Sequence, residues 1–447
     1  MLVEWFEVKN NIYACLEIGC SEARIIVCNI REERLYILSQ QEVVAEGIEN
    51  GNVVNVSQIV DVLKTLKHKV EQDLNQDVQS ILLAIPSVDV NIENVNMTLD
   101  LESNKPISPT NIKQLLRNVI NQPTYRDQVA VNVIPRAFVV DEKNAIQNPL
   151  GIIGNAVSLR AQKVTASSSL VYNLINVVEL AGFRISDIMI GSIAEMMYAV
   201  TPEQMHKGAC HVNIGKSTTT ITVSQSGKII STVSLSIGGQ TVTEDICEAF
   251  GIDGNIAETL KLNFARINHD ESRPEIIYTA EVNQGFVCIT RQMIADVVTA
   301  RYENILKLVK QYITENGYKH DEIQYIFTGG ASELEGFEVL AKFIFAQDIS
   351  IFRPSMLGVR HSKFAKLVGM ATFSHEMALL TGQKSNIINF EAYTESNQLD
   401  QKLQEKGTVK APPLKQKNQE KSFVDHKLEN SGVLVRLFDM IFDEKVE

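Results

Sequence analysis

Short runs of apolar residues, separated by polar turns, predict an alternation of strands and helices through most of the chain. Three strands are expected at 13–18, 24–30 and 34–44, because these runs are rich in β-branched residues and end at turn residues. A helix is expected to be capped by Ser57, since apolar residues then recur every three to four positions. A short buried strand is predicted at 80–86.

Residues 87–163 interrupt this alternation, and we predict that they form a small separate subdomain inserted into the first lobe. They contain polar strands, a helix that starts at Ser108 and Pro109, and the strand-like run 129–140. Helices and strands alternate again from about residue 164, with elements expected at 168–181, 188–190 and 193–200.

A second strand–turn–strand unit resembles the first. The segments ACLEIGCSEARIIV (14–27) and ACHVNIGKSTTTITV (209–223) share Ala-Cys and a glycine-centred turn between apolar strands. The strands of this unit are expected at 210–214, 219–223 and 229–235. The duplication suggests two related lobes. Chance similarity is the alternative, because glycine is common in turns.

Length, charge and hydropathy restrict the class of protein. At 447 residues the chain is too long for one hydrophobic core, so two or more domains are expected. The formal net charge of −12 argues against general nucleic-acid binding, which depends on Lys and Arg neutralising phosphates. The N-terminus is acidic where a signal peptide needs positive charge, and no apolar run is long enough to span a bilayer. We therefore expect a cytoplasmic body.

Six cysteines are scattered along the chain, at positions 15, 20, 28, 210, 247 and 288. They form no CxxC pair, and no histidine lies near them at metal-binding spacing. We expect small buried thiols in a reducing compartment.

The composition changes near the end of the chain. Residues 384–430 are polar, contain Pro412-Pro413 and lack periodicity, which predicts a disordered linker. The segment 431–443 is predicted to form an amphipathic helix. Its apolar stripe has the spacing i, i+3, i+4, i+7 and i+8 and consists of Leu434, Leu437, Phe438, Ile441 and Phe442.

We expect this helix to lie on a membrane. At roughly 17 Å it is far shorter than the ~30 Å hydrocarbon core, so it can lie in the interface but cannot span the bilayer. Lysines of the linker can attract anionic lipid, whereas Asp439 and Asp443 weaken that attraction. Firm attachment would need several copies acting together. Docking of the stripe on the protein's own core or on a partner is the alternative.

Three turns are candidates for binding phosphate. The word GKST at 215–218 is not a P-loop, because the first glycine of that motif would fall on Cys210 and a strand follows in place of a helix. The turns 17–21, 213–219 and 328–332 each place small residues after an apolar strand, so that backbone N–H groups can approach an anion. Together they indicate a nucleotide site.

With these turns the chain resembles the actin-like ATPases, and among them the FtsA family of bacterial cell-division proteins. The most specific segment, VIPRAFVVDEKNAIQNPLGIIG (133–154), is similar to the end of that family's insert. Further matching segments are VVELAGFRI (177–185), LSIGGQTVTEDICEAFG (235–251), IFTGGASELEGF (326–337) and FAKLVGMATF (364–373). The resemblance implies an α/β, actin/Hsp70-like two-lobed nucleotide-binding fold with an inserted α+β subdomain, a disordered linker and a C-terminal amphipathic helix.

The resemblance also implies which residues bind ATP and, through water, Mg²⁺; no direct metal ligand is expected. The implied positions are the acidic residue near the metal, Glu17; the first phosphate turn, Gly19, Cys20 and Ser21; the second phosphate turn, Asn213, Gly215, Lys216, Ser217 and Thr218; the segment between the lobes, Gly238 and Gly239; the adenosine-contacting pair, Glu258 and Lys261; and the adenosine turn, Gly329 and Gly330.

Four positions depart from the family's pattern. Asn213 replaces the usual Asp, and Lys216 and Ala265 replace glycines. Glu22 stands where a Lys often follows the first turn, and it would repel phosphate unless it turns away. Lys216 or Arg24 could restore positive charge. Because an amide cannot act as a general base or offer a carboxylate to water on Mg²⁺, we expect weak or absent ATP hydrolysis.

The domain division expected from these patterns has five parts. They are a first lobe at 1–86, continued at 164–200 and 358–383; the insert at 87–163; a second lobe at 201–357 with an outer subdomain at about 240–310; the linker at 384–430; and the amphipathic helix at 431–443.

The resemblance implies a structural adaptor at the division site, on the cytoplasmic face of the inner membrane. Such a protein assembles with copies of itself, binds lipid and other division proteins, and captures the tubulin-like polymer FtsZ through the outer subdomain of its second lobe. A PilM-like scaffold of a pilus or secretion assembly is one alternative. A phosphotransfer enzyme such as a sugar kinase is another, and it would need a catalytic carboxylate in the cleft.

Overall fold

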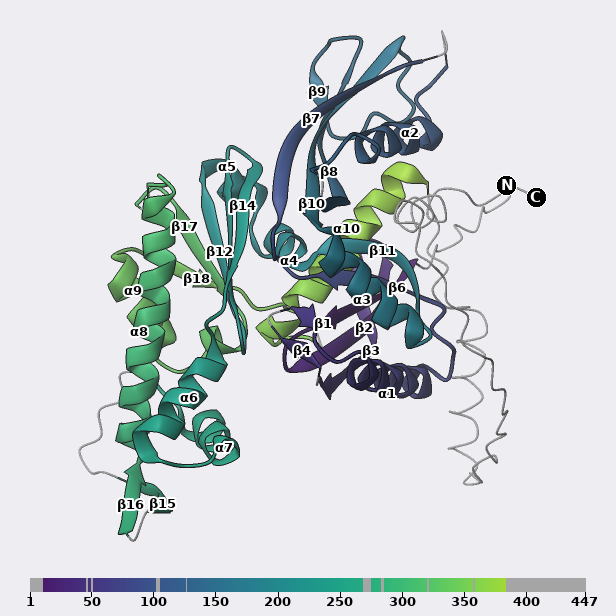
Figure 1. Ribbon diagram of the computed structural model, residues 1–447. Coiled ribbons are helices and arrows are strands. Elements are labelled where there is room, and N and C mark those ends of the chain that lie inside the picture. Colours follow the sequence, from purple (N-terminus) through teal and green to yellow (C-terminus); the bar gives the residue numbers. More distant parts are fainter. Residues whose placement is uncertain are drawn as a thin grey trace, which may run out of the picture.

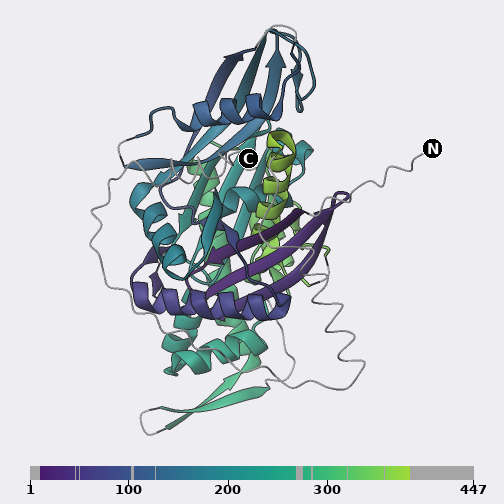
Figure 2. The ribbon, with the colours of Figure 1, turned by 90° about the vertical axis from the view of Figure 1, so that its right-hand side faces the viewer.

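The computed structural model describes residues 11–382, except 46, 50, 102–104, 126, 268–274, 283–284, 320 and 357. The predicted linker and C-terminal helix lie outside the described residues. Figure 1 shows two lobes side by side and a third, smaller body above the first lobe. In the turned view of Figure 2 the first lobe lies in front of the second, and the smaller body is again at the top. Three groups of buried apolar side chains form the cores of these bodies.

The first lobe is built on a five-stranded sheet with the order β11-β6-β1-β2-β3. The first three strands form an antiparallel meander, whereas β6 and β11 run parallel to β1. Nearly every residue of β1 and β6 is buried, as expected where helices cover both faces of a sheet. The strands are β1 (Asn11–Ile18), β2 (Glu22–Arg31), β3 (Arg34–Val44), β6 (Ser80–Ile85) and β11 (Arg184–Ile190), with the small hairpin β4 (Ile48–Glu49) and β5 (Asn52–Val53).

Helices of this lobe pack in pairs. Residues of α1 contact α3, and residues of α4 contact α10. The four helices are α1 (Val56–Leu74), α3 (Ser168–Leu180), α4 (Gly191–Ala199) and α10 (Ala365–Thr381). The last of them returns from the far end of the sequence to pack on β1, so the first lobe closes only when the whole described chain is in place.

The second lobe repeats the topology of the first. Its sheet has the order β14-β13-β12-β17-β18, again a three-stranded antiparallel meander followed by two parallel strands. Read from its meander edge, each sheet therefore has the same third, second, first, fourth and fifth strand. This common order confirms two related lobes, because chance likeness of one hairpin would not extend to the crossover strands. The strands are β12 (Ala209–Ile214), β13 (Thr219–Gln225), β14 (Lys228–Leu235), β17 (Gln324–Thr328) and β18 (Ile349–Ile351).

An outer part of the second lobe extends away from this sheet. Two helices and a hairpin form it, and the long helix α8 runs back from the hairpin toward the sheet (Figure 1). Its elements are α6 (Gly239–Phe250), α7 (Gly254–Phe264), β15 (Ile276–Val282), β16 (Gly285–Thr290) and α8 (Arg291–Glu315). The remaining helices of the lobe are α5 (Pro202–Lys207), η1 (Gly330–Glu333) and α9 (Phe337–Phe345), and η2 (Ser362–Phe364) precedes α10.

The inserted body is an α+β unit with a core of its own. Its four-stranded antiparallel sheet has the order β7-β10-β8-β9 and is covered by one helix. As predicted, that helix starts after Ser108, whose side chain accepts the N–H of Asn111, with Pro109 in the first turn. The elements are β7 (Asn91–Asp100), α2 (Pro109–Ile120), β8 (Gln128–Val140), β9 (Ala145–Ile146) and β10 (Ala156–Ser167).

The insert is fastened to both lobes. The buried side-chain amide of Gln162, on β10, bonds the backbone of Ile229 in the second lobe twice, at 2.8 Å and 3.0 Å. Its oxygen also accepts from the guanidinium of Arg136. On the other side, Met377 and Leu380 of α10 pack into the insert core. The insert therefore sits across the junction of the lobes, where it can restrict their relative movement.

Two expected boundaries need correction. The first helix is capped by Asn55, whose side-chain oxygen accepts from the N–H of Gln58 at 3.2 Å, and Ser57 lies inside the helix and donates to the same oxygen. An Asn cap is as favourable as Ser, so composition alone does not separate the two. The strand β11 begins at Arg184 and not at 188, because it is an edge strand with a bulge, where polar residues are tolerated.

All six cysteines are free thiols. Cys15, Cys28 and Cys210 are buried as expected, whereas Cys20 is half-buried beside the cleft described below and Cys288 is exposed. The expectation of burial therefore holds for the cysteines in the central strands and fails for the one in the outer hairpin.

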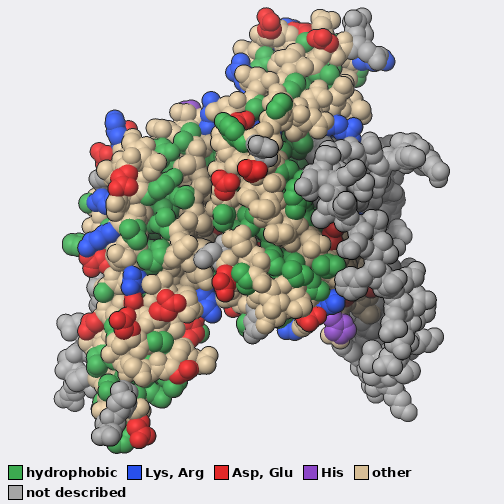
Figure 3. Space-filling model, viewed as in Figure 1, with side chains coloured by type: hydrophobic (Ala, Val, Ile, Leu, Met, Phe, Trp, Pro, Cys, Tyr) green, Lys and Arg blue, Asp and Glu red, His purple; other side chains and the backbone are tan. Residues whose placement is uncertain are grey.

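The surface carries both signs of charge. On the face drawn in Figure 3, Lys and Arg side chains are scattered among Asp and Glu over both lobes. Among the described helices, we find none with both the length and the apolar character needed to cross a membrane.

Candidate functional site

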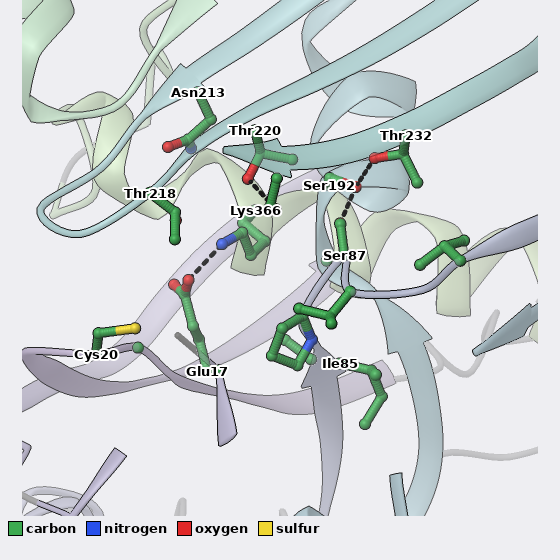
Figure 4. Close-up of a pocket in the computed structure, with 18 of the residues that line it drawn as sticks. Glu17, Cys20, Ile85, Ser87, Ser192, Asn213, Thr218, Thr220, Thr232 and Lys366 are labelled. Atoms are coloured by element: carbon green, nitrogen blue, oxygen red, sulfur yellow. Dashed lines mark hydrogen bonds and ion pairs between the residues drawn. The ribbon is translucent and has the colours of Figure 1, made fainter. Parts of the chain in front are cut away.

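A cleft of about 450 Å³ lies between the two lobes. Most of the side chains that point into it are polar and come from both lobes (Figure 4). The polar residues that line it include Glu17, Cys20, Ser87, Ser192, Glu195, Asn213, Thr218, Thr232 and Lys366. The meander turns of both sheets reach this cleft, and Ser and Thr hydroxyls are the most frequent polar groups in its wall.

The two predicted phosphate turns have the same internal hydrogen bond. In the first lobe the N–H of Gly19 donates to the carbonyl of Glu22 at 3.0 Å, and in the second the N–H of Gly215 donates to Thr218 at 2.9 Å. Each bond links residue i to i+3 between the first and second strands of its sheet. The duplication seen in the sequence thus extends to the hydrogen bonding of the turns.

Five of the fifteen predicted nucleotide-binding residues line this cleft, namely Glu17, Gly19, Cys20, Asn213 and Thr218. Most of the others form a second group behind the Gly215 turn. There the N–H groups of Gly239 and Gln240, at the start of α6, donate to the carbonyls of Gly215 at 2.9 Å and Lys216 at 2.6 Å. The side chain of Lys216 is exposed, and Ser21 bonds Ala45 through its carbonyl.

Two glycines of the second group are required by close backbone contact. A Cβ on Gly238 would lie 2.6 Å from the carbonyl oxygen of Gly215. Gly329 has φ of +88°, and a Cβ there would lie 2.4 Å from the carbonyl oxygen of Ile214. The turns at 215, 238 and 329 therefore touch one another through backbone atoms, and side chains larger than hydrogen cannot enter.

The predicted adenosine-contacting pair, Glu258 and Lys261, forms a cluster that joins α6 and α7. The ammonium of Lys261 donates to the carbonyl of Gly239 at 2.8 Å, to the hydroxyl of Thr243 at 2.7 Å and to the carboxylate of Glu258 at 2.6 Å. Burial outweighs the attraction of Glu258 and holds the pKa of Lys261 below its ordinary value. All three donors of this ammonium are used within the protein.

Replacing Lys261 by Met is therefore expected to destabilise the protein even without nucleotide. The loss should be about 2 kcal/mol, the cost of leaving a buried acceptor of charged hydrogen bonds unsatisfied. Urea unfolding of the nucleotide-free protein measures it. Lys307→Met, which removes an exposed lysine that pairs with Glu303 on α8, is the matched control and should change stability by less than about 0.5 kcal/mol. Equal stability of Lys261→Met and wild type would contradict this structural role.

The acidic residue of the first turn is held by two cations. Glu17 Oε1 accepts a hydrogen bond from the ammonium of Lys366 (Figure 4), and Arg24 Nη1 lies 3.6 Å from Oε2. Burial would raise the pKa of Glu17, but the charges of Lys366 and Arg24 outweigh it and lower that pKa. The carboxylate is thus ionised and already neutralised by neighbours.

Glu22, which departs from the family pattern, is paired with a cation. Its carboxylate forms an ion pair with the guanidinium of Arg24, and Arg24 also lies 3.6 Å from Glu42. The repulsion expected from Glu22 is therefore offset by Arg24, one of the two residues suggested for that role.

Asn213 faces a buried carboxylate that the sequence did not identify. Its side-chain nitrogen donates to both oxygens of Glu195, at 2.7 Å and 2.8 Å. Glu195 is fully buried on α4, and this burial raises its pKa. The cleft therefore does contain a carboxylate, as a kinase would need, but both of its oxygens are bound by Asn213.

A chain of hydroxyl groups crosses from one lobe to the other along the cleft. Ser87 bonds Ser192 at 2.5 Å, and Ser192 bonds Thr232 of the second lobe at 2.8 Å. Thr232 in turn bonds Thr222 at 2.9 Å. These bonds hold the lobes at one separation on this side of the cleft.

Sequence reasoning missed Lys366 and Glu195, although each leaves a signal. Lys366 is a single charge in the apolar segment FAKLVGMATF, and Glu195 is a single charge in GSIAEMMYAV. A lone charge within a mostly apolar helix is rarely buried unless it has a partner. Such residues can be selected from the sequence as members of a buried pair, but the identity of the partner cannot.

Comparisons with known proteins agree with this architecture. A family model described as cell division protein FtsA matches residues 210–369, and one described as an SHS2 domain inserted in FTSA matches residues 88–165. The two matches do not overlap and together cover more than half of the chain.

Full-length relatives and one solved structure extend the comparison. Cell division protein FtsA of Bacillus subtilis is 26% identical over 382 residues, which are 84% of this chain and 86% of the relative. The protein of the same name from Streptococcus pneumoniae is 22% identical over 371 residues, 83% of this chain and 81% of the relative. A structure of the PilM-PilN type IV pilus biogenesis complex matches with a TM-score of 0.55 and 13% identity, over 81% of this chain and 98% of that chain. This last likeness concerns the fold alone. The predicted actin/Hsp70-like fold with an inserted α+β subdomain is confirmed.

Proposed function

The chain belongs to the FtsA family of cell division proteins, and we propose that it is an adaptor that tethers the tubulin-like polymer FtsZ to the cytoplasmic face of the inner membrane at the division site. Tethering requires a surface that binds lipid, a surface that binds the polymer, and a body that joins the two. The observation that carries the proposal is the apolar stripe predicted at 434–442, placed beyond a polar linker.

The stripe supports reversible attachment to lipid. In the predicted helix its five apolar side chains would share one face too short to span a bilayer, and the acidic residues beside it would limit the attraction to anionic lipid. A single copy should therefore bind weakly. Self-assembly of the body would raise the local concentration of helices and convert weak binding into firm attachment.

The second lobe supports the contact with FtsZ. Its outer part, between about residues 240 and 310, projects away from the cleft, the insert and the first lobe (Figure 1). A polymer that binds the far end of this part, the β15–β16 hairpin, would not displace α6 and α7, which carry the predicted nucleotide-binding residues Gly239, Glu258 and Lys261. We infer that this part contacts FtsZ, and that other division proteins bind elsewhere on the body.

ATP is the proposed ligand of the cleft. Two glycine turns reach it from opposite lobes, and the Gly238–Gly239 segment lies against the turn of the second lobe. Bound there, ATP would link the lobes and favour one assembly state. Hydrolysis is expected to be weak or absent, because the amide of Asn213 cannot accept a proton and Glu195 is held by that amide.

Sedimentation with liposomes tests the tether directly. Full-length protein is expected to carry most of the FtsZ into the lipid pellet, whereas a chain ending at Asn430 should leave it near the protein-free background, because the stripe is removed. A matched pair refines the test. Phe438→Glu, on the stripe, should weaken lipid binding at least roughly tenfold, since it buries a charge in the interface. Met440→Glu, off the stripe, introduces the same charge and should weaken it much less.

Two results would contradict the proposal. Equal delivery of FtsZ by the full-length and shortened chains would exclude the tether. Recovery of pilus components and no FtsZ in a pull-down would favour the PilM-like alternative, since that scaffold is expected to dock on the cytoplasmic tail of a membrane protein and not to need the stripe.

A further inference from the structure

The position implied for a metal-linked carboxylate does not suit Mg²⁺ in this protein. Of the two oxygens of Glu17, Oε1 accepts from the ammonium of Lys366. Oε2 is buried from solvent and accepts no hydrogen bond from any described residue, and the cation nearest to it is Arg24 Nη1 at 3.6 Å. Oε1 is therefore bonded to Lys366, and a metal-bound water molecule that reached Oε2 would place the metal ion beside the cations of Lys366 and Arg24.

Two other carboxylates line the cleft, those of Glu195 and the exposed Asp89, but among the described residues they form no cluster with Glu17 that could hold a metal ion. Asn213 presents an amide whose nitrogen is bound to Glu195, and both oxygens of Glu195 are bound in return. Within the part of the chain that the structure describes, no cluster of three or more His, Cys, Asp or Glu side chains is arranged to hold a metal ion. Mg²⁺ prefers several oxygen ligands, water included, in octahedral geometry.

The ammonium of Lys366 places a positive charge in the cleft beside Glu17. This residue stands at the start of α10, and its aliphatic stem lies over Gly191, where an added Cβ would be 2.6 Å from Lys366 Cδ. The side chain remains 23% exposed and lines the cleft (Figure 4). Its ammonium has three donors, and among the described residues only Glu17 accepts from it. Two donors are left for a ligand.

We propose that Lys366 takes the place of a divalent cation in this cleft, so that it binds the phosphates of a nucleoside di- or triphosphate without Mg²⁺. The inference rests on the nucleotide binding proposed above. Its ligand is a polyphosphate anion, held by the Lys366 ammonium together with the backbone N–H groups of the two turns.

Electrostatics favours the free nucleotide over its metal complex. A Mg²⁺ ion close enough to be attracted by Glu17 would be about as close to Lys366, and the repulsion between the two cations would cancel most of that attraction. Although burial disfavours the charged form, Glu17 and Glu195 keep the pKa of Lys366 above its ordinary value, so the ammonium stays protonated at neutral pH. A fixed ammonium then performs the charge neutralisation that a metal would supply.

Calorimetric titration of the full chain with ATP and ADP, in excess Mg²⁺ and in EDTA, tests this inference. For wild type we expect binding in EDTA, and an apparent dissociation constant at least roughly tenfold higher in excess Mg²⁺, because the metal withdraws the free nucleotide that the cleft binds. Lys366→Met keeps most of the length of the unbranched side chain, removes its charge and frees Glu17. It should bind at least roughly tenfold more weakly in EDTA, the loss expected for a charged hydrogen bond, and regain affinity in Mg²⁺. Lys363→Met is the matched control. Lys363 lies three residues before Lys366 and pairs with Glu42, and its replacement should leave the nucleotide affinity as in wild type in both media.

The outcomes separate this inference from the proposed function. Wild-type binding that disappears in EDTA overturns the inference and leaves nucleotide binding intact. Metal-independent binding by Lys366→Met also overturns it, because another group then supplies the charge. No binding by wild type in either medium overturns both nucleotide binding and this inference, while the tether is judged separately by sedimentation.

A measurement on wild type covers the case in which Lys366→Met fails to fold. Mn²⁺ is paramagnetic, and its resonance spectrum distinguishes the nucleotide-bound ion from an ion also held by protein. With ATP at a concentration that saturates the cleft, we expect protein to lower the Mn²⁺–ATP signal only by withdrawing free nucleotide. A new protein-bound Mn²⁺ signal would overturn the inference.

Discussion

Replacing Asn213 by Asp is expected to lower the free energy of unfolding by about 3–5 kcal/mol at pH 8, the range found when a buried charge is left uncompensated. The change restores the residue usual in the family, yet here it would set a second carboxylate against Glu195. Both oxygens of Glu195 now accept from the Asn213 amide, at 2.7 Å and 2.8 Å. In the variant two hydrogen bonds are lost and two like charges face each other.

The loss should depend on pH in a defined direction. Burial and the neighbouring carboxylate raise the pKa of the new Asp above its unfolded value of about 3.9, so the folded state binds the extra proton more tightly. The penalty is therefore small below about pH 4, grows as the pH rises through the interval between the unfolded and folded pKa values, and is complete above the latter. Because the two carboxyls share protons, the interval belongs to the pair.

A charge exchange provides the control for this variant. Adding Glu195→Gln to Asn213→Asp reverses donor and acceptor, because the new amide at position 195 can then donate to the new carboxylate at position 213. At least half of the lost stability should return at pH 8, and the pH dependence should flatten. Urea unfolding between pH 4 and pH 8 measures all three proteins. Wild-type stability of the single variant at pH 8 would show that Asn213 and Glu195 do not face each other.

Replacing Gly369 by Ala should cost about 2–3 kcal/mol, because an extra methyl group enters a fully packed helix contact. A Cβ at this position would lie 2.2 Å from the carbonyl oxygen of Ala194 and 3.1 Å from Cβ of Tyr198. Both obstacles belong to α4, and one is backbone that cannot turn aside. The loss should exceed the gain of about 1 kcal/mol that Ala brings to a helix.

Gly254→Ala is the matched control for this change. Gly254 begins α7, and an added Cβ would meet nothing within 4 Å. It should leave stability unchanged or raise it slightly. Thermal unfolding compares the two variants, and a Gly369→Ala protein as stable as wild type would show that α4 and α10 are further apart than the structure has them.

The substitutions at Asn213 and Gly369 both affect the contacts of α4. Helices α4 and α10 touch at Gly369, and each contributes one charge to the cleft, Glu195 from α4 and Lys366 from α10. The far end of α10 packs into the insert core through Met377 and Leu380. A movement of α10 would therefore change both the position of the Lys366 ammonium in the cleft and the contact of α10 with the insert.

The sequence by itself determined the elements and their class. Apolar periodicity predicted the meander strands of both lobes and the insert strand at 129–140, and the Ser108-Pro109 pair predicted a helix start, because these features depend only on neighbouring residues. The word GKST could be rejected as a P-loop for the same reason, since the strand that follows it is local. The repeated glycine turn suggested two related lobes before the sheet orders were known.

Only the tertiary structure decided the charge of the cleft. Glu17 meets Lys366 from 349 positions along the chain, and Asn213 meets Glu195 across the junction of two lobes. Which buried charges become partners depends on how α4 and α10 cross beneath the sheets, and that crossing is set by packing of many side chains at once. Local pattern therefore identifies Lys366 and Glu195 as unusual residues. Only three-dimensional packing shows that Lys366 neutralises the carboxylate of Glu17, and that Glu195 binds the amide of Asn213, which replaced the family's usual Asp.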